Sequence, residues 1–107
     1  MHAVIVQVEV DRSQEDLARK LLREVTVPRA QALAGFESGT WLRALQGGRG
    51  MSVLLFDSED TARAAADQIR SQGPPQGSPV TMESVDAFEV VAQAYRSVVV
   101  WAACSSR

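Results

Sequence analysis

The chain has 107 residues, 46% of them hydrophobic and 22% charged, which indicates one small globular domain and excludes a disordered chain. The formal net charge of −2 excludes the basic surface of a nucleic-acid-binding protein or of one held on an anionic membrane. Cys104 is the one cysteine, so no internal disulfide is expected. Without a secretion signal or an apolar run of about 18 residues, the expected location is the cytoplasm.

Residues 3–10 predict a half-buried strand, because β-branched residues recur there at a period of two. The valines at positions 4, 6, 8 and 10 share one face, and Gln7 and Glu9 share the other. A helix is predicted next, with Ser13 and Asp16 as its capping pair. Its apolar face comprises Leu17, Leu21, Leu22 and Val25.

Pro28 interrupts this helical pattern. It predicts either a kink or a second short helix from Pro28 to Leu33, because proline is tolerated only in a first helical turn. A strand over 36–46 follows, with Gly39, Trp41, Arg43 and Leu45 on one side. The sequence Gly47-Gly48-Arg49-Gly50 then predicts a hairpin turn and not a phosphate cradle, since it lies between two strands.

The second half of the chain repeats this order of elements. Residues 51–56 predict a strand buried on both faces, and residues 59–72 predict an alanine-rich helix capped by Asp57 or Ser58. The inner face of that helix comprises Ala62, Ala65, Ala66 and Ile69. A fourth strand is predicted over 80–91, with a bend near Asp86 because twelve residues exceed the usual strand length.

The predicted order βαββαβ is the ferredoxin-like α+β arrangement, an antiparallel four-stranded sheet with two helices on one face. The domain would span residues 1–93, followed by a tail, 94–107, that is either an extra strand or disordered. Because strands are apolar on both faces, the face without helices should also be covered. In so short a chain only a second copy can cover it, so we predict a homodimer through the sheet face.

At this point the sequence resembles the dimeric α+β-barrel superfamily, and in particular its antibiotic-biosynthesis-monooxygenase-like domains. The resemblance covers roughly residues 3–92 and rests on Pro28, Gly35-Phe36, Gly39, Trp41 and Phe56-Asp57-Ser58-Glu59. It implies two sheets that close into a barrel across the dimer, with a pocket between each sheet and its helices. Members include cofactor-free oxygenases of polycyclic phenols, haem-degrading enzymes and proteins without known activity.

The resemblance also implies which chemistry to expect. Haem-degrading members use a histidine on a helix with an asparagine and a tryptophan above the haem, whereas this chain has only His2 and no asparagine. Haem degradation is therefore not expected. One histidine, one cysteine and scattered carboxylates provide no metal cluster, so neither a metal nor another cofactor is expected.

Four residues are predicted to bind a ligand: Gln7, Phe36, Trp41 and Arg43. The Trp41 indole beside a strand glycine can form a flat wall for an aromatic molecule, or it can be core packing. Gln7 and Glu9 are polar contacts if their face lines a barrel and are solvated if it does not. Arg43 can pair with a ligand carboxylate or with Glu9.

Three functions remain open from the sequence. The first is a dimeric barrel domain that binds a small apolar or aromatic molecule between sheet and helices. The second is a cofactor-independent monooxygenase, whose pocket would stabilise a substrate carbanion for reaction with dioxygen. The third is a regulatory small-molecule-binding module, which is disfavoured because the loop Asp11-Arg12-Ser13 lacks the glycine typical of such modules.

Overall fold

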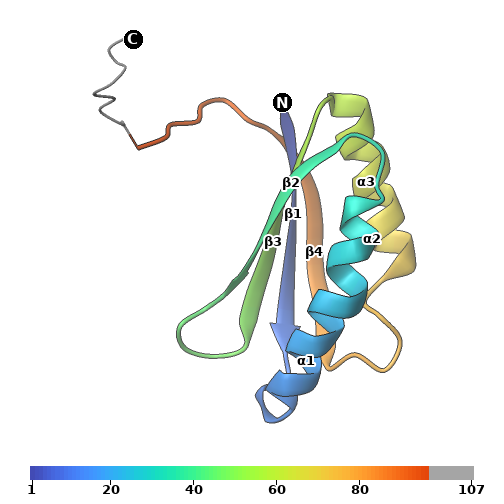
Figure 1. Cartoon of the computed structure of the whole chain (residues 1–107), viewed down its shortest axis with the longest axis vertical. Coiled ribbons are helices and arrows are strands. Elements are labelled where there is room, and N and C mark those ends of the chain that lie inside the picture. Colours follow the sequence, from blue (N-terminus) through green and yellow to red (C-terminus); the bar gives the residue numbers. More distant parts are fainter. Residues whose placement is uncertain (97–107) are drawn as a thin grey trace, which may run out of the picture.

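The computed structural model describes residues 1–96 and contains one antiparallel sheet with strand order β2-β3-β1-β4. The strands are β1 (His2–Val10), β2 (Phe36–Arg43), β3 (Arg49–Phe56) and β4 (Val80–Glu89). The helices are α1 (Glu15–Leu21), α2 (Val27–Gln31) and α3 (Glu59–Gln72). All of them lie on one face of the sheet, and the other face is open (Figure 1). This is the ferredoxin-like α+β fold predicted from the order of elements.

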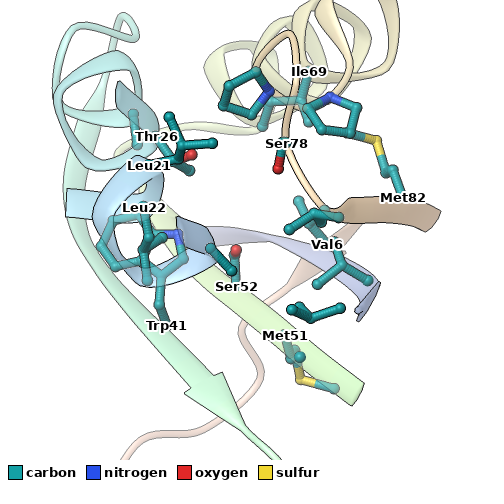
Figure 2. A pocket seen from close by; sticks show the side chains of 18 of the residues that line it. Val6, Leu21, Leu22, Thr26, Trp41, Met51, Ser52, Ile69, Ser78 and Met82 are labelled. Carbon is teal, nitrogen blue, oxygen red and sulfur yellow. The ribbon is translucent and has the colours of Figure 1, made fainter. Parts of the chain in front are cut away.

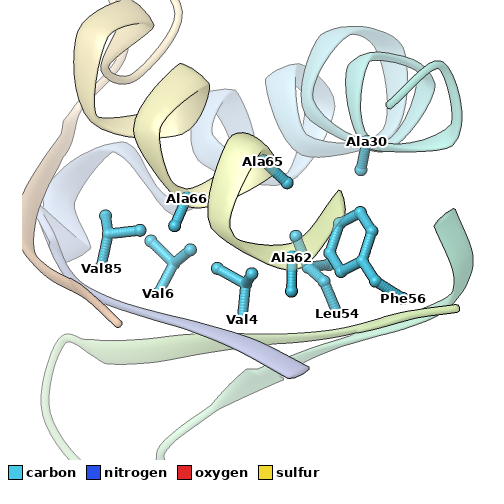
Figure 3. Packing of buried hydrophobic residues seen from close by; sticks show 9 residues of the cluster. All are labelled: Val4, Val6, Ala30, Leu54, Phe56, Ala62, Ala65, Ala66 and Val85. Atoms are coloured by element: carbon cyan, nitrogen blue, oxygen red, sulfur yellow. The ribbon is translucent and has the colours of Figure 1, made fainter. Parts of the chain in front are cut away.

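The core lies between α3 and the middle of the sheet. Small side chains on α3 let this helix approach the strands closely, as Figure 3 shows for Ala62, Ala65 and Ala66. They cover Val4 and Phe56, whose side chains have no exposed surface. The helix begins where predicted, since the Ser58 hydroxyl accepts the amide of Thr61 at 3.2 Å. The predicted inner face of this helix is confirmed.

The first helical segment differs from the prediction at its start. The cap is Asp11, not Ser13: its carboxylate accepts the Ser13 amide at 3.0 Å and the Ser13 hydroxyl at 2.7 Å. These bonds open a short 3₁₀ turn, Arg12–Gln14, before α1. The predicted apolar face is also partly wrong, because Leu17 is 37% exposed and the buried residue of α1 is Ala18.

Pro28 lies in the first turn of a second short helix, as one of the two predicted alternatives has it, although this helix spans Val27–Gln31 and not Pro28 to Leu33. Between α1 and α2 the chain forms a wider π-helical turn, Leu22–Thr26, in which the Val27 amide donates to the Leu22 carbonyl. A proline ring clashes with the carbonyl four residues earlier, and a wider turn relieves that clash. The segment therefore runs without a break from Glu15 to Gln31.

Two strands, β2 and β4, are shorter than predicted. β2 ends at Arg43, and Leu45, placed in the strand from the sequence, is fully exposed in the following turn. β4 ends at Glu89, and its irregularity lies opposite Gln7 and Val8, not near Asp86. A register shift there lets a ten-residue strand follow the twist of β1.

Residues 90–96 continue without regular secondary structure after the Val90 amide donates to the Met1 carbonyl at 3.0 Å. The rest of the predicted tail, 97–107, lies outside the described residues. Within residues 1–96, no helix is long and apolar enough to cross a membrane.

Candidate functional site

A cavity of about 240 Å³ lies between the helices and the covered face of the sheet. Its floor is formed by Val6 and Val8 of β1 with neighbouring residues of β2, β3 and β4. One wall is the helical segment from Glu15 to Leu33, and the other contains Ile69 of α3 and the loop that follows it. Figure 2 shows Leu22 and Ile69 on opposite sides of this space. The cavity is therefore enclosed by separate parts of the chain.

The cavity exists because small residues face each other across it. Ala18 and Ala30 line it from the helices, and Gly50 and Ser52 line it from β3. Space remains where the small residues face one another, since too few atoms are present to fill it. The sequence around these residues thus determines the place of the cavity.

Trp41 forms a flat part of the lining. Its six-membered ring lies over Gly39, where a Cβ atom would come within 2.7 Å of Cη2 of the indole. Trp41 is half-buried, packs partly against the core and also lines the cavity. Core packing of Trp41 is therefore partly confirmed, and its place in the cavity lining keeps its predicted role as a ligand wall open.

Arg43 closes one end of the cavity by joining three segments. Its guanidinium binds both carboxylate oxygens of Glu15 in α1. It also donates to the carbonyl of Gly48 at 2.9 Å, in the turn before β3. The predicted pairing with Glu9 does not occur, since the partner is Glu15. The hydrogen bond from Arg43 is the main cause that lowers the pKa of Glu15 below its ordinary value of 4.5.

Hydroxyl groups from three segments lie in this mostly apolar lining. Thr26, Ser52 and Ser78 all line the cavity, and Figure 2 shows the oxygens of Ser52 and Ser78 directed into the space from opposite sides. Within residues 1–96 these three hydroxyls make no side-chain hydrogen bond to the protein. Sequence reasoning missed them, because single hydroxyls in a strand, a helix and a loop carry no pattern.

The other two predicted ligand residues do not line the cavity. Gln7 is exposed on the open face of the sheet, as the valine alternation in β1 requires. Phe36 packs edge-on against Phe56, with ring centroids 6.1 Å apart, and supports the core beside Trp41. Of the four predicted residues, the structure therefore brings together Trp41 and Arg43.

A second, more polar hollow lies at the other end of the sheet, between His2 and the start of α3. The Nδ1 atom of His2 is buried there without a hydrogen-bond partner. Across residues 1–96 no group of three histidine, cysteine or acidic residues could hold a metal ion. The hollow therefore has fewer side chains that could bind a ligand than the cavity beside Trp41 has.

No protein-family model matches the chain, and no curated protein matches it. Solved structures do share its fold. The heme-degrader MhuD from Mycobacterium tuberculosis, with two hemes bound in its active site, is 24% identical and aligns with a TM-score of 0.65 over 89% of this chain and all of that one. HapK from Hahella chejuensis is 16% identical, with a TM-score of 0.62 over 92% of this chain and all of HapK.

A third solved structure carries a bound organic ligand. The monooxygenase ActVA-Orf6 of Streptomyces coelicolor, in complex with nanaomycin D, is 17% identical and aligns with a TM-score of 0.56 over 90% of this chain and 92% of that one. These likenesses establish the fold as that of antibiotic-biosynthesis-monooxygenase-like proteins and confirm the resemblance seen in the sequence. At such identities they establish the fold alone.

Proposed function

We propose that this chain binds a small, flat, mostly apolar molecule with oxygen-bearing groups in the cavity between the sheet and the helices. The observation that carries the proposal is the pairing of an apolar lining beside the Trp41 ring with hydroxyls that make no side-chain hydrogen bond to the described residues, 1–96. Ligand sites combine a largely apolar wall with a few polar groups that orient the ligand. Two of the neighbouring structures contain bound organic ligands, heme and nanaomycin D, which supports an organic ligand here.

The volume favours a molecule smaller than haem. Ligand pockets usually measure about 300 to 1,000 Å³, and this cavity has about 240 Å³. Haem iron takes histidine, thiolate, phenolate or thioether ligands, and among the described lining residues only the thioethers of Met51 and Met82 belong to these classes. The described lining residues therefore do not fit a haem held by a histidine.

The lowered pKa of Glu15 favours ligand binding over catalytic turnover as the function of the cavity. A cofactor-free oxygenase would need a base to form the substrate carbanion. Glu15 is the carboxylate in the described lining, and its hydrogen bonds to Arg43 lower its pKa and weaken it as a base. The cavity can orient a phenol or a ketone with its hydroxyls, but a strong base is missing from the described lining.

The second part of the proposal is a homodimer through the open face of the sheet. Register places Ile5 of β1 beside Val53 of β3, with Leu55 and Leu42 on the same face. Phe88 of β4 extends this apolar surface and is 50% exposed. Contiguous exposed apolar surfaces of this kind mark interaction sites. A second copy covers the surface with the same residues, as a two-fold interface requires.

A cavity-filling variant tests the binding proposal. Replacement of Trp101 by Phe leaves Trp41 as the single tryptophan, whose fluorescence then reports on the cavity. We expect 2-naphthol to quench this emission in a saturable titration. In Ser52→Leu the added side chain occupies the cavity, so the affinity should fall about tenfold or more while the thermal midpoint does not fall. Ser71→Leu, on an exposed position of α3, is the control.

Two results would contradict the proposal. One is the absence of saturable quenching by 2-naphthol. The other is an equal affinity in the Ser52→Leu and Ser71→Leu variants, because binding would then take place outside the cavity.

A further inference from the structure

Charge is distributed unevenly around the cavity. Arg19, Arg29 and Arg43 line it, while Glu15 is the acidic residue of the described lining, although the chain as a whole has a formal net charge of −2. All of these charges lie on the side formed by α1, α2 and β2. The lining residues of α3, the following loop and β4 are uncharged.

The carboxylate of Glu15 is already occupied. It accepts from Arg19 at 3.0 Å in addition to Arg43, so two guanidinium groups share one negative charge. Arg43 is also held by the carbonyl of Gly48. This end of the cavity therefore has an excess of positive charge, and the geometry of Arg43 is fixed before a ligand arrives.

Arg29 is different, because within residues 1–96 it has no carboxylate within ion-pair distance and no side-chain hydrogen bond. Its side chain is exposed and still lines the cavity, which places it at the rim. A guanidinium at the rim can contact a ligand group that faces water while the rest of the ligand is buried. Guanidinium groups bind carboxylates with paired hydrogen bonds, which adds orientation to the charge attraction.

From this distribution we propose that the ligand is an aromatic acid, bound with its carboxylate toward Arg29 at the rim and with its ring in the apolar interior beside Trp41. The inference rests on the proposed function and adds the charge and the orientation of the ligand. A neutral aromatic molecule would fit the same apolar lining but would leave Arg29 without a partner.

Two probes of the same shape separate charge from shape. 2-Naphthoate and 2-naphthamide share a ring and a planar substituent, and they differ in charge. Fluorescence titration of the Trp101→Phe protein at low ionic strength should show 2-naphthoate binding about tenfold tighter. Added salt should reduce this difference, because the rim is open to solvent.

Variants that remove either a positive or a negative charge from the cavity lining make the test specific to those charges. Arg29→Gln should weaken 2-naphthoate about tenfold and leave 2-naphthamide unchanged. Glu15→Gln should strengthen 2-naphthoate, since it leaves Arg19 and Arg43 without their carboxylate. Arg23→Gln removes an exposed charge of the same helical segment that does not line the cavity, and it should change neither affinity.

The outcomes distinguish the two proposals. If 2-naphthamide and 2-naphthoate bind equally well, the aromatic-acid inference is wrong and the proposed function stands. If neither probe binds, the proposed function is wrong and the inference fails with it. Equal losses of 2-naphthoate affinity in Arg29→Gln and Arg23→Gln would also overturn the inference, because the effect would then come from net charge and not from Arg29.

Discussion

Trp41 can line the cavity because Gly39, two positions earlier on β2, has no side chain. A Cβ atom there would also come within 3.0 Å of a Leu54 methyl group, so a larger residue would displace the indole or the core. The ring thus lies flat on the strand and presents its other side to the cavity. The position of one glycine determines the shape of the proposed ligand wall.

The ion pair between Glu15 and Arg43 predicts a pH dependence of stability. The pKa of Glu15 is lowered in the folded protein, so the pair stabilises the fold above the ordinary value of 4.5 and this stabilisation is lost as the pH falls through the lowered pKa. Urea unfolding should show Glu15→Gln less stable than wild type by about 1 kcal/mol near neutral pH, since both side chains are partly exposed.

The same unfolding measurements, repeated at lower pH, can contradict this prediction. Below the lowered pKa both proteins carry a neutral side chain at position 15, and the difference in free energy of unfolding should shrink towards zero. A difference that stays constant from neutral pH down to the most acidic pH at which both proteins still fold would mean that the side chain acts by packing and not by charge.

At the scale of elements, the two helical layers have different roles. α3 packs tightly through alanines, whereas the segment from Glu15 to Gln31 stands over the cavity and supplies Glu15, Arg19 and Arg29 of its charged lining. The π-helical turn in that segment brings Leu22 and Thr26 to the cavity wall. Wide turns of this type are frequent at functional sites. α3 thus supplies most of the helical part of the core, and the segment from Glu15 to Gln31 supplies most of the helical lining of the cavity.

Because α3 packs tightly on the sheet, the loss of stability on enlarging one of its alanines should depend strongly on which face of the helix the alanine occupies. Ala66 is 2% exposed, so Ala66→Leu should lower the free energy of unfolding by about 1–3 kcal/mol through overpacking. Ala64 lies on the exposed face of the same helix, and Ala64→Leu should stay within about 0.5 kcal/mol of wild type. Equal stability of the two variants in denaturant titrations would contradict the assigned face of α3.

Periodic features of the sequence were predictable. The alternation in residues 3–10 predicted the faces of β1, the cap at Ser58 predicted the start of α3, and the alanine spacing predicted its inner face. The common face of Trp41 and Arg43, which brings both to the cavity lining, was predictable for the same reason, since alternate positions of a strand share a face. Glu15 and Arg29 were missed because their nearness to Arg43 and to the cavity depends on how the first helical segment crosses the sheet, which no local pattern encodes.

At the scale of the whole molecule, the open face of the sheet is the feature that a single chain leaves unexplained. Val53→Glu places a charge in the middle of this apolar face and, through two-fold symmetry, faces the same charge in a second copy. The dissociation constant of the dimer should rise about 100-fold or more. Sedimentation should then show a wild-type dimer and a monomeric variant, with Gln68→Glu on exposed α3 surface as a dimeric control. A monomeric wild type at micromolar concentration would contradict the proposed interface.

The central claim, that the ligand lies between the helices and the covered face of the sheet, is tested most directly by nuclear Overhauser effects between 2-naphthoate and protein methyl groups. The protein would carry labelled methyl groups in isoleucine, leucine and valine. We predict contacts from the naphthalene protons to Val6 and Leu22, which line the cavity, and none to Ile5 and Val53 on the open face. Contacts to Ile5 and Val53 without contacts to Val6 and Leu22 would contradict the account, because the ligand would then occupy the face assigned to the second copy.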